Sequence, residues 1–199
     1  MFAGTYSTLQ KYDSDGQLLW TNPTVGATIE SRKILFPSDG AAYILDYRTL
    51  TKCFAGDGFK WTYEAYSDLL DFAIAPDGSM YVLETVDIGA WEREYLKLKK
   101  FTSDGLPLWE EYVTFDLHRL SEAKVAVNSS GRVMVGYGAI ATPQPDVWQT
   151  TLRMAMFTQD GYRLWDNPYA PPISCRDFYL SMGVAPTNDI LLMVAYRMD

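Results

Sequence analysis

The sequence has very few of the residues that hold metals, form disulfides or carry out acid–base catalysis. It contains two cysteines, Cys53 and Cys175, and one histidine, His118, among 199 residues. Two cysteines that lie far apart do not make a disulfide framework, so we expect buried free thiols. A lone histidine with no nucleophile motif beside it gives no recognisable catalytic constellation. We therefore predict no metal, no cofactor and no catalytic residue.

Positive charge and long apolar segments are also scarce. The chain has 17 Lys and Arg against 25 Asp and Glu, a net charge of -8. Nucleic acids and anionic membranes attract basic surfaces, so we predict neither as a partner. No segment approaches the length of a membrane span, and the N-terminus shows no basic region followed by an apolar stretch. We expect no membrane insertion and no export signal, and hence a place in a virion or in the cytoplasm.

What the chain does have is a repeated phrase, Asp-Gly-x-x-x-Trp. It occurs at 15–20, 104–109 and 160–165, and 57–61 is a copy one residue shorter. A second phrase, a turn followed by a β-branched or aromatic run, alternates with the first. Its copies are 37–44, 76–82, 129–134 and 186–192. Self-similarity of this kind predicts a repeat architecture.

Each repeat is expected to form two β-hairpins. In 72–84 two apolar runs flank a Pro-Asp-Gly turn, and Gly78 can take the positive φ of a tight hairpin, which we name A–B. The segment 95–109 does the same around Gly105 and gives hairpin C–D. At the last A–B turn Asn188 replaces glycine, and asparagine tolerates the left-handed conformation. Helix signals are weak, and 110–122 is expected to form at most a short helical turn.

These hairpins predict an all-β fold, a β-propeller of four four-stranded blades in a single domain, 1–199. Three blades are complete, and the fourth is shared between the termini. The segments are the C–D hairpin 1–20, the blades 31–61, 70–109 and 122–165, and the A–B hairpin 181–197. Pairing of the two terminal hairpins would complete one blade from both ends and close the ring without a free strand edge.

The repeats also resemble known propeller sequences. The segments 16–20, 105–109 and 161–165 are similar to the Gly-x-x-x-Trp docking motif of quinoprotein-type propellers, in which the Trp packs between neighbouring blades. The pattern of 75–82 followed by 100–105 resembles short bacterial propeller repeats. The resemblance covers nearly the whole chain and implies a fold, but no activity, because such repeats occur in enzymes, scaffolds and adhesins. The chain lacks the family's adjacent cysteine pair, so no quinone is predicted.

The candidate site is a surface made of long connections. The short Asp-Gly turns share one face of a propeller, and the irregular connections share the other, where binding residues collect. These connections are 21–31, 63–70, 85–94, 111–123, 138–151 and 167–180. Trp91 and Trp148 lie outside the repeated phrases, each near the end of one of these connections. The structural alternative is that each Trp caps the apolar end of its own blade. The predicted contact residues are Trp91, Trp148, Tyr137, Tyr179, Arg93 and His118.

Three functions remain open. The first is a non-enzymatic binding or structural module that presents its loop-rich face to a protein partner, as part of a larger assembly such as a bacteriophage virion or tail. The second is a glycan-binding propeller, lectin-like or adhesin, whose tryptophans and tyrosines stack on sugar rings. The third is a hydrolase or lyase that uses carboxylates and His118.

Overall fold

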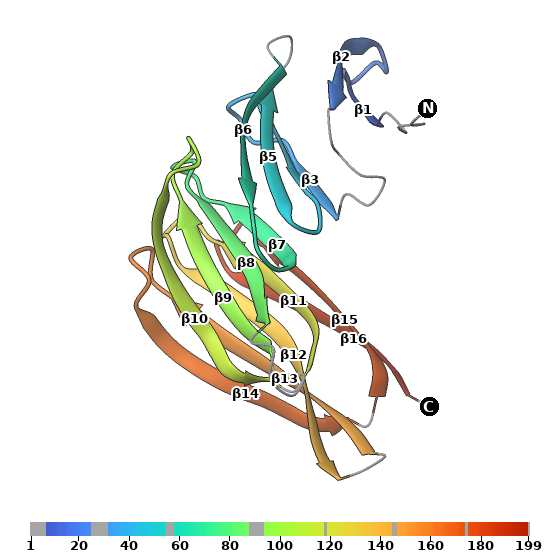
Figure 1. Cartoon of the computed structure of the whole chain (residues 1–199), viewed down its shortest axis with the longest axis vertical. Coiled ribbons are helices and arrows are strands. Elements are labelled where there is room, and N and C mark those ends of the chain that lie inside the picture. The colour runs from blue at the N-terminus through green and yellow to red at the C-terminus, as the bar shows by residue number, and fades with distance from the viewer. Residues whose placement is uncertain are drawn as a thin grey trace. The chain divides into compact units, whose positions relative to one another are not determined.

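The computed structural model describes residues 7–24, 32–54, 58–87, 94–117, 119–144, 147–173 and 175–198. All regular structure in these residues is β-strand, which confirms the all-β prediction (Figure 1). The described residues contain no helix of the kind that could span a membrane. The chain divides into two compact units, a first unit, Met1–Leu69, and a second unit, Leu70–Asp199.

The strands form three four-stranded antiparallel sheets and two separate hairpins, each sheet taking its strands in chain order. The first hairpin is β1 (Ser7–Tyr12) and β2 (Leu18–Thr24). The sheets are β3 (Lys33–Leu35), β4 (Ala42–Leu45), β5 (Thr49–Phe54), β6 (Gly58–Glu64); β7 (Leu69–Ile74), β8 (Met80–Asp87), β9 (Glu94–Phe101), β10 (Pro107–Leu117); and β11 (Arg119–Val127), β12 (Val133–Gln144), β13 (Val147–Phe157), β14 (Arg163–Ile173). The last hairpin is β15 (Cys175–Val184) and β16 (Ile190–Met198). The hairpins β1–β2 and β15–β16 are two-stranded sheets of their own, so closure of a ring stays a prediction.

The A–B turns form at the residues that the sequence predicts. Gly78 has a φ of 81° and donates its N–H to the carbonyl of Ala75 at 2.9 Å, which closes the A–B turn. Asn188 has a φ of 72° and makes the same bond to Ala185, also at 2.9 Å. Asn188 is the only described residue other than glycine with a positive φ. The use of asparagine as a glycine substitute at this turn is therefore confirmed.

Several connections expected to be irregular are strand instead. In the second unit β10 extends to Leu117, β12 to Gln144 and β14 to Ile173, and the next strand begins at most three residues later. The prediction of long loops over 111–123, 138–151 and 167–180 was therefore wrong. The described residues of 110–122 are strand, in keeping with the weak helix signals there. The strands continue because cross-strand pairing continues past the repeat motif, with bulges that absorb the irregular sequence.

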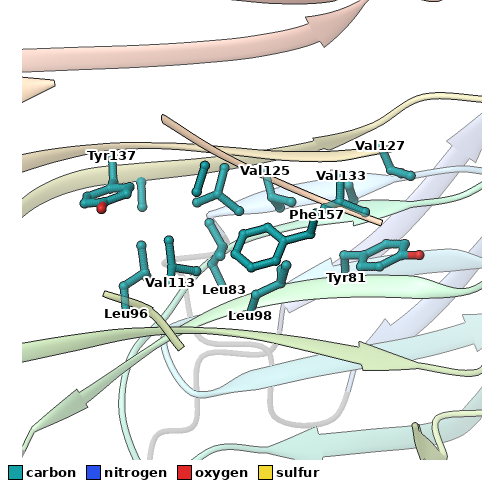
Figure 2. Close-up of a cluster of buried hydrophobic side chains, with 14 of the residues drawn as sticks. Tyr81, Leu83, Leu96, Leu98, Val113, Val125, Val127, Val133, Tyr137 and Phe157 are labelled. Atoms are coloured by element: carbon teal, nitrogen blue, oxygen red, sulfur yellow. The ribbon is translucent and has the colours of Figure 1, made fainter. Parts of the chain in front are cut away.

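The main core of the second unit lies between the sheets β7–β10 and β11–β14. Figure 2 shows side chains of one sheet, among them Leu83 and Leu98, facing Val125 and Val133 of the other, with the ring of Phe157 among them. All four aliphatic side chains are buried. In the first unit a smaller cluster joins Ala42, Ile44 and Cys53. Burial of apolar area between sheets is the principal stabilising term of this arrangement.

Polar contacts join neighbouring sheets in the second unit. The buried Asp71 carboxylate of β7 accepts the Val125 N–H of β11 at 2.9 Å. In the same way the Glu122 carboxylate of β11 accepts the N–H of Leu180 in β15. Each bond joins the first strand of one sheet to the first strand of the sheet or hairpin that follows. The sheets of the second unit therefore stack in series.

Candidate partner-binding surface

The structure describes only part of the predicted contact surface. Trp91, Arg93 and His118 lie outside the described residues. Trp148 belongs to β13, and its side chain is outside the description. Tyr137 and Tyr179, the two predicted contact residues whose side chains are described, have opposite environments.

Tyr137 lies in the core and not on a surface. Its side chain on β12 is 0 % exposed, within the cluster between β7–β10 and β11–β14 (Figure 2). Burial raises the pKa of its hydroxyl, against smaller opposing effects of Arg153 and Thr114. The prediction that this ring contacts a ligand is corrected, because it packs against the facing sheet. Tyr179 on β15 is 61 % exposed and keeps its candidacy.

Among the repeated tryptophans, Trp109 docks one sheet onto the next. Its Nε1 donates to the carbonyl of Gln159, in the C–D turn between β13 and β14, at 3.0 Å. Lys100 Nζ donates to the same carbonyl at 2.9 Å. The indole covers Gly161, where an added Cβ would lie only 3.2 Å from Cδ2 of Trp109. The packing of Trp109 between sheets, which the quinoprotein-type resemblance implied, is confirmed.

The first unit repeats part of this arrangement. Trp61 makes an edge contact with Tyr43, with ring centroids 6.2 Å apart, and Trp109 contacts Tyr81 at 5.9 Å. The buried Lys52 pairs with the Asp39 carboxylate at 2.9 Å. Although burial opposes the charge, hydrogen bonds to Tyr43 and Asp39 raise the pKa of Lys52. A lysine, a tyrosine and a tryptophan thus recur at equivalent places, which indicates a structural role for the set.

Trp165, the tryptophan of the copy at 160–165, is partly exposed. It lies on β14 opposite Met156, as Trp109 lies opposite Lys100 on β9. Its side chain is 39 % exposed. This tryptophan therefore keeps a substantial surface open to solvent.

One apolar surface that the sequence did not reveal is one side of the last hairpin, which we call the β15–β16 face. It carries Tyr179, Leu191 and Met193, the latter two 60 % and 65 % exposed, and Gly183, above which nothing lies within 4 Å. The opposite side of the hairpin packs inward. Leu192 lies 3.3 Å from a Cβ placed on Gly136, and Leu180 is buried.

Repeat equivalence shows that exposure of this face is exceptional. Leu191 follows the A–B turn residue Asn188 by three positions, as Tyr81 follows Gly78 and Met134 follows Gly131. Tyr81 and Met134 are buried beneath a neighbouring sheet or hairpin. The signal in the sequence was therefore present: an aliphatic residue at a position that other repeats bury. It could not be recognised without knowing which faces are covered.

A second apolar feature recurs in three of the four copies of the motif. In these copies the residue before the tryptophan is a leucine that is about half exposed, namely Leu19, Leu108 and Leu164. Exposed leucine at the same repeat position adds apolar surface along the outer edges of the sheets. Within the described residues no three metal-ligating side chains come together.

Comparison with known proteins gives a fold relationship alone. No protein-family model matches the chain, and no curated protein matches its sequence. A solved structure of a protein of unknown function from Bacteroides caccae superposes with a TM-score of 0.55 at 12 % sequence identity. The match covers 89 % of this chain and 57 % of that one, so the chain spans little more than half of its structural neighbour. At this identity the likeness shows a shared all-β architecture and nothing of activity.

Proposed function

We propose that the chain is a non-enzymatic β-propeller module, binding or structural, that engages a protein partner through the β15–β16 face. The observation that carries this proposal is the exposure of Leu191 and Met193 at positions that the preceding repeats bury. Exposed apolar side chains grouped on one side of a hairpin are typical of a protein–protein interface. This surface takes the place of the loop-rich face expected from the sequence, because much of that face is strand.

The propeller itself is part of the proposal. Its support is the serial stacking of sheets by Trp109 on Gly161 and by Glu122 on the Leu180 N–H. The hairpin β15–β16 has the sequence phase of A–B, and β1–β2 has that of C–D. The two together would supply the four strands of one further blade. A ring of four blades closed by that shared blade remains our prediction from the sequence.

We place the module in a larger assembly, of which a bacteriophage virion or tail is one example and a cytoplasmic complex another. This setting rests on fold analogy and on the apolar face that needs cover. Cross-linking mass spectrometry in the native particle or cells tests it, with Tyr179 and Ser181 on the face as reference points. We expect cross-links from 177–195 to another polypeptide, and their loss in Met193→Asp. Recovery of a free monomer without such cross-links would contradict the proposal.

Glycan binding is a second candidate, favoured by one observation. The Tyr179 ring is exposed on a rigid strand, which suits stacking on a sugar. A glycan array with the protein and with Tyr179→Ala tests this, and Tyr66→Ala is the control because Tyr66 is 98 % exposed elsewhere. An array with no signal sinks the idea. The hydrolase or lyase hypothesis rests on His118, outside the described residues, and stays a prediction.

A further inference from the structure

Four of the eight methionines lie in one layer of the second unit, between the sheet β11–β14 and the hairpin β15–β16 (Figure 1). Met134 on β12 and Met154 and Met156 on β13 share the side of the sheet that lies opposite the main core, because the residues that alternate with them belong to that core. Met182 on β15 reaches the same side from the hairpin, since its Sδ lies 3.4 Å from a Cβ placed on Gly136. The layer therefore collects four thioether groups.

Two of these methionines replace a tyrosine and a lysine that other sheets carry. One row of three direct cross-strand partners recurs in each four-stranded sheet. The rows are Tyr43, Lys52, Trp61; Tyr81, Lys100, Trp109; and Met134, Met156, Trp165. The first two rows hold a lysine ammonium over the tyrosine ring, 4.8 and 5.3 Å from the ring centroid. The third row keeps the tryptophan but has thioethers where the other two rows have the tyrosine and the cation.

Gly136 is the residue that admits Met182 to this layer. It lies directly opposite Met154 and two residues after Met134 on the same side of β12. Because glycine has no side chain, the Sδ of Met182 takes the space above its Cα. Directly opposed Cβ atoms on antiparallel strands are about 5 Å apart and diagonal ones roughly 7–8 Å, distances that long side chains bridge. The four flexible thioethers can therefore converge on one ion.

Burial and charge in the layer are compatible with a bound cation. Met154, Met156 and Met182 are half-buried, so solvent and small ions reach their side of the sheet. Lys124, which lies opposite Gly136 on β11, has its charge compensated by the Glu122 carboxylate at 3.1 Å. The net charge of -8 attracts cations to the molecule as a whole.

The ligand chemistry selects a soft ion of low charge. Soft sulfur ligands favour Cu(I), whereas hard ions such as Mg²⁺ prefer carboxylates and water. An uncharged thioether suits a monovalent ion, because it brings no negative charge to offset a higher one. An indole ring also attracts a cation over its face.

We propose that the layer binds one Cu(I) ion through the thioethers of Met134, Met154, Met156 and Met182, beside Trp165. The ion takes the place that a lysine ammonium has in the other two rows. The described residues bring together no three His, Cys, Asp or Glu side chains, and thioethers are a separate class of ligand. The expectation of no metal came from the scarcity of histidine and cysteine, and it did not consider methionine.

The site is independent of the proposed partner surface. It lies on the inward side of the last hairpin, where Leu192 also approaches Gly136, whereas the β15–β16 face is the outward side. Failure of one proposal therefore leaves the other standing.

Anaerobic titration with Cu(I) against a coloured chelator of known affinity tests the site. Cys53 and Cys175 are replaced by alanine in every protein titrated, because a thiolate would compete for the ion. We expect one ion per chain, bound at least about tenfold more weakly by Met156→Leu and by Met182→Leu, since even changes outside the ligand set cost that much. Leucine conserves volume, so it retains the packing and removes the ligand. Met193→Leu, on the outward side of the hairpin, is the matched control and should bind as the parent does.

A second variant, Met156→Lys, gives the third row the lysine of the other two. We expect it to remain folded, because two other sheets hold lysine at this position beside tryptophan. It should abolish Cu(I) binding, because its ammonium takes the place of the ion. Circular dichroism and melting temperature verify that each variant is folded.

Peroxide oxidation followed by mass spectrometry tests the unmodified chain without any substitution. Ag(I) is the probe, because it shares the preference of Cu(I) for soft ligands and does not cycle between oxidation states with peroxide. We expect Ag(I) to protect Met154, Met156 and Met182 from conversion to the sulfoxide, and to leave Met193 unprotected.

Three results would overturn the site. The first is a parent chain that binds no Cu(I), which would make the methionines apolar packing alone. The second is equal affinity in the parent and Met156→Leu. The third is protection of Met193 by Ag(I) as strong as that of Met156, which would show adventitious binding to any accessible thioether.

Discussion

At the scale of single residues, one glycine makes the docking of one sheet on the next possible. The Trp109 indole lies against Gly161, and any side chain at that position would meet Cδ2 at 3.2 Å. Gly161 also has a φ of 89°, so it meets two demands that only glycine meets without cost. The close approach and the positive φ can be measured separately, because Gly40 has the positive φ but no neighbour within 4 Å of an added Cβ.

The first prediction compares Gly161→Ala with Gly40→Ala. Gly40 has a φ of 78° and nothing within 4 Å of an added Cβ, so its substitution costs only the left-handed strain, about 1 kcal/mol. Gly161→Ala should lower the free energy of unfolding by a further ~1–3 kcal/mol, because the indole must be displaced. Denaturant titration measures both. Equal losses would show that Trp109 does not depend on close approach to this glycine.

Asn188 also has two roles, one of its backbone and one of its side chain. Its left-handed backbone would suit glycine, yet its side-chain oxygen accepts the N–H and the hydroxyl of Ser129, both at 2.7 Å. Its own carbonyl accepts from Asn128 at 3.1 Å. The residue therefore ties the A–B turn of β15–β16 to that of β11–β12.

The second prediction is that Asn188→Gly destabilises the protein although it relieves the backbone. Loss of the two hydrogen bonds outweighs the relief, and we expect a net loss of about 1 kcal/mol. Asn188→Asp keeps an accepting oxygen and should lose less. Thermal unfolding of the three proteins measures the order. A glycine variant more stable than the unmodified chain would show that the turn-to-turn bonds contribute nothing.

At the scale of elements, equivalent strand positions differ in what covers them. Leu83 on β8 and Met193 on β16 follow their A–B turn residues by five positions. Leu83 is fully buried against the neighbouring sheet, and Met193 is largely exposed. Strands of the same sequence phase can therefore bury this side chain or leave it exposed.

The third prediction turns this contrast into numbers. Leu83→Ala should cost about 2–5 kcal/mol of unfolding free energy, because it leaves a cavity between sheets. Met193→Ala should cost less than about 0.5 kcal/mol in dilute solution, where the face is open. For association with the partner we expect the opposite order. Met193→Ala should weaken association more than Leu83→Ala does, because only Met193 lies on the proposed interface. Comparable losses of stability in dilute solution would mean that the monomer itself covers β16.

At the scale of the whole molecule, charge limits the choice of partner. A protein with a net charge of -8 repels phosphate groups. Binding to a nucleic acid requires basic side chains that neutralise the phosphate charge. The apolar face on β15–β16 is instead suited to a protein surface.

The fourth prediction follows from that charge. Fluorescence anisotropy of a labelled oligonucleotide should not change on addition of the protein, even at an ionic strength of about 0.01 M, where screening is weakest. Sedimentation with anionic vesicles should likewise leave the protein in solution. Salt-sensitive binding in either experiment would show a basic patch that the net charge conceals.

The strands and their turns are the part of this protein that the sequence determined by itself. Positive φ at Gly78 and Asn188 and the alternation beside them are local properties, set by a few neighbouring residues. The docking role of Trp109 was also foreseen, because a repeated glycine and tryptophan at constant spacing carries its own geometry. All-β structure and antiparallel hairpins followed from these signals alone.

Which side of each strand is covered was decided only by the tertiary structure. Tyr137 and Tyr179 look alike in sequence, yet one is sealed between two sheets and the other is open. The sequence also did not predict that β10 and β14 continue beyond the repeated phrase, because those residues become strand by pairing with neighbouring strands. Burial and pairing are long-range events that depend on which sheet arrives at which face, whereas a turn depends on the φ of one or two residues.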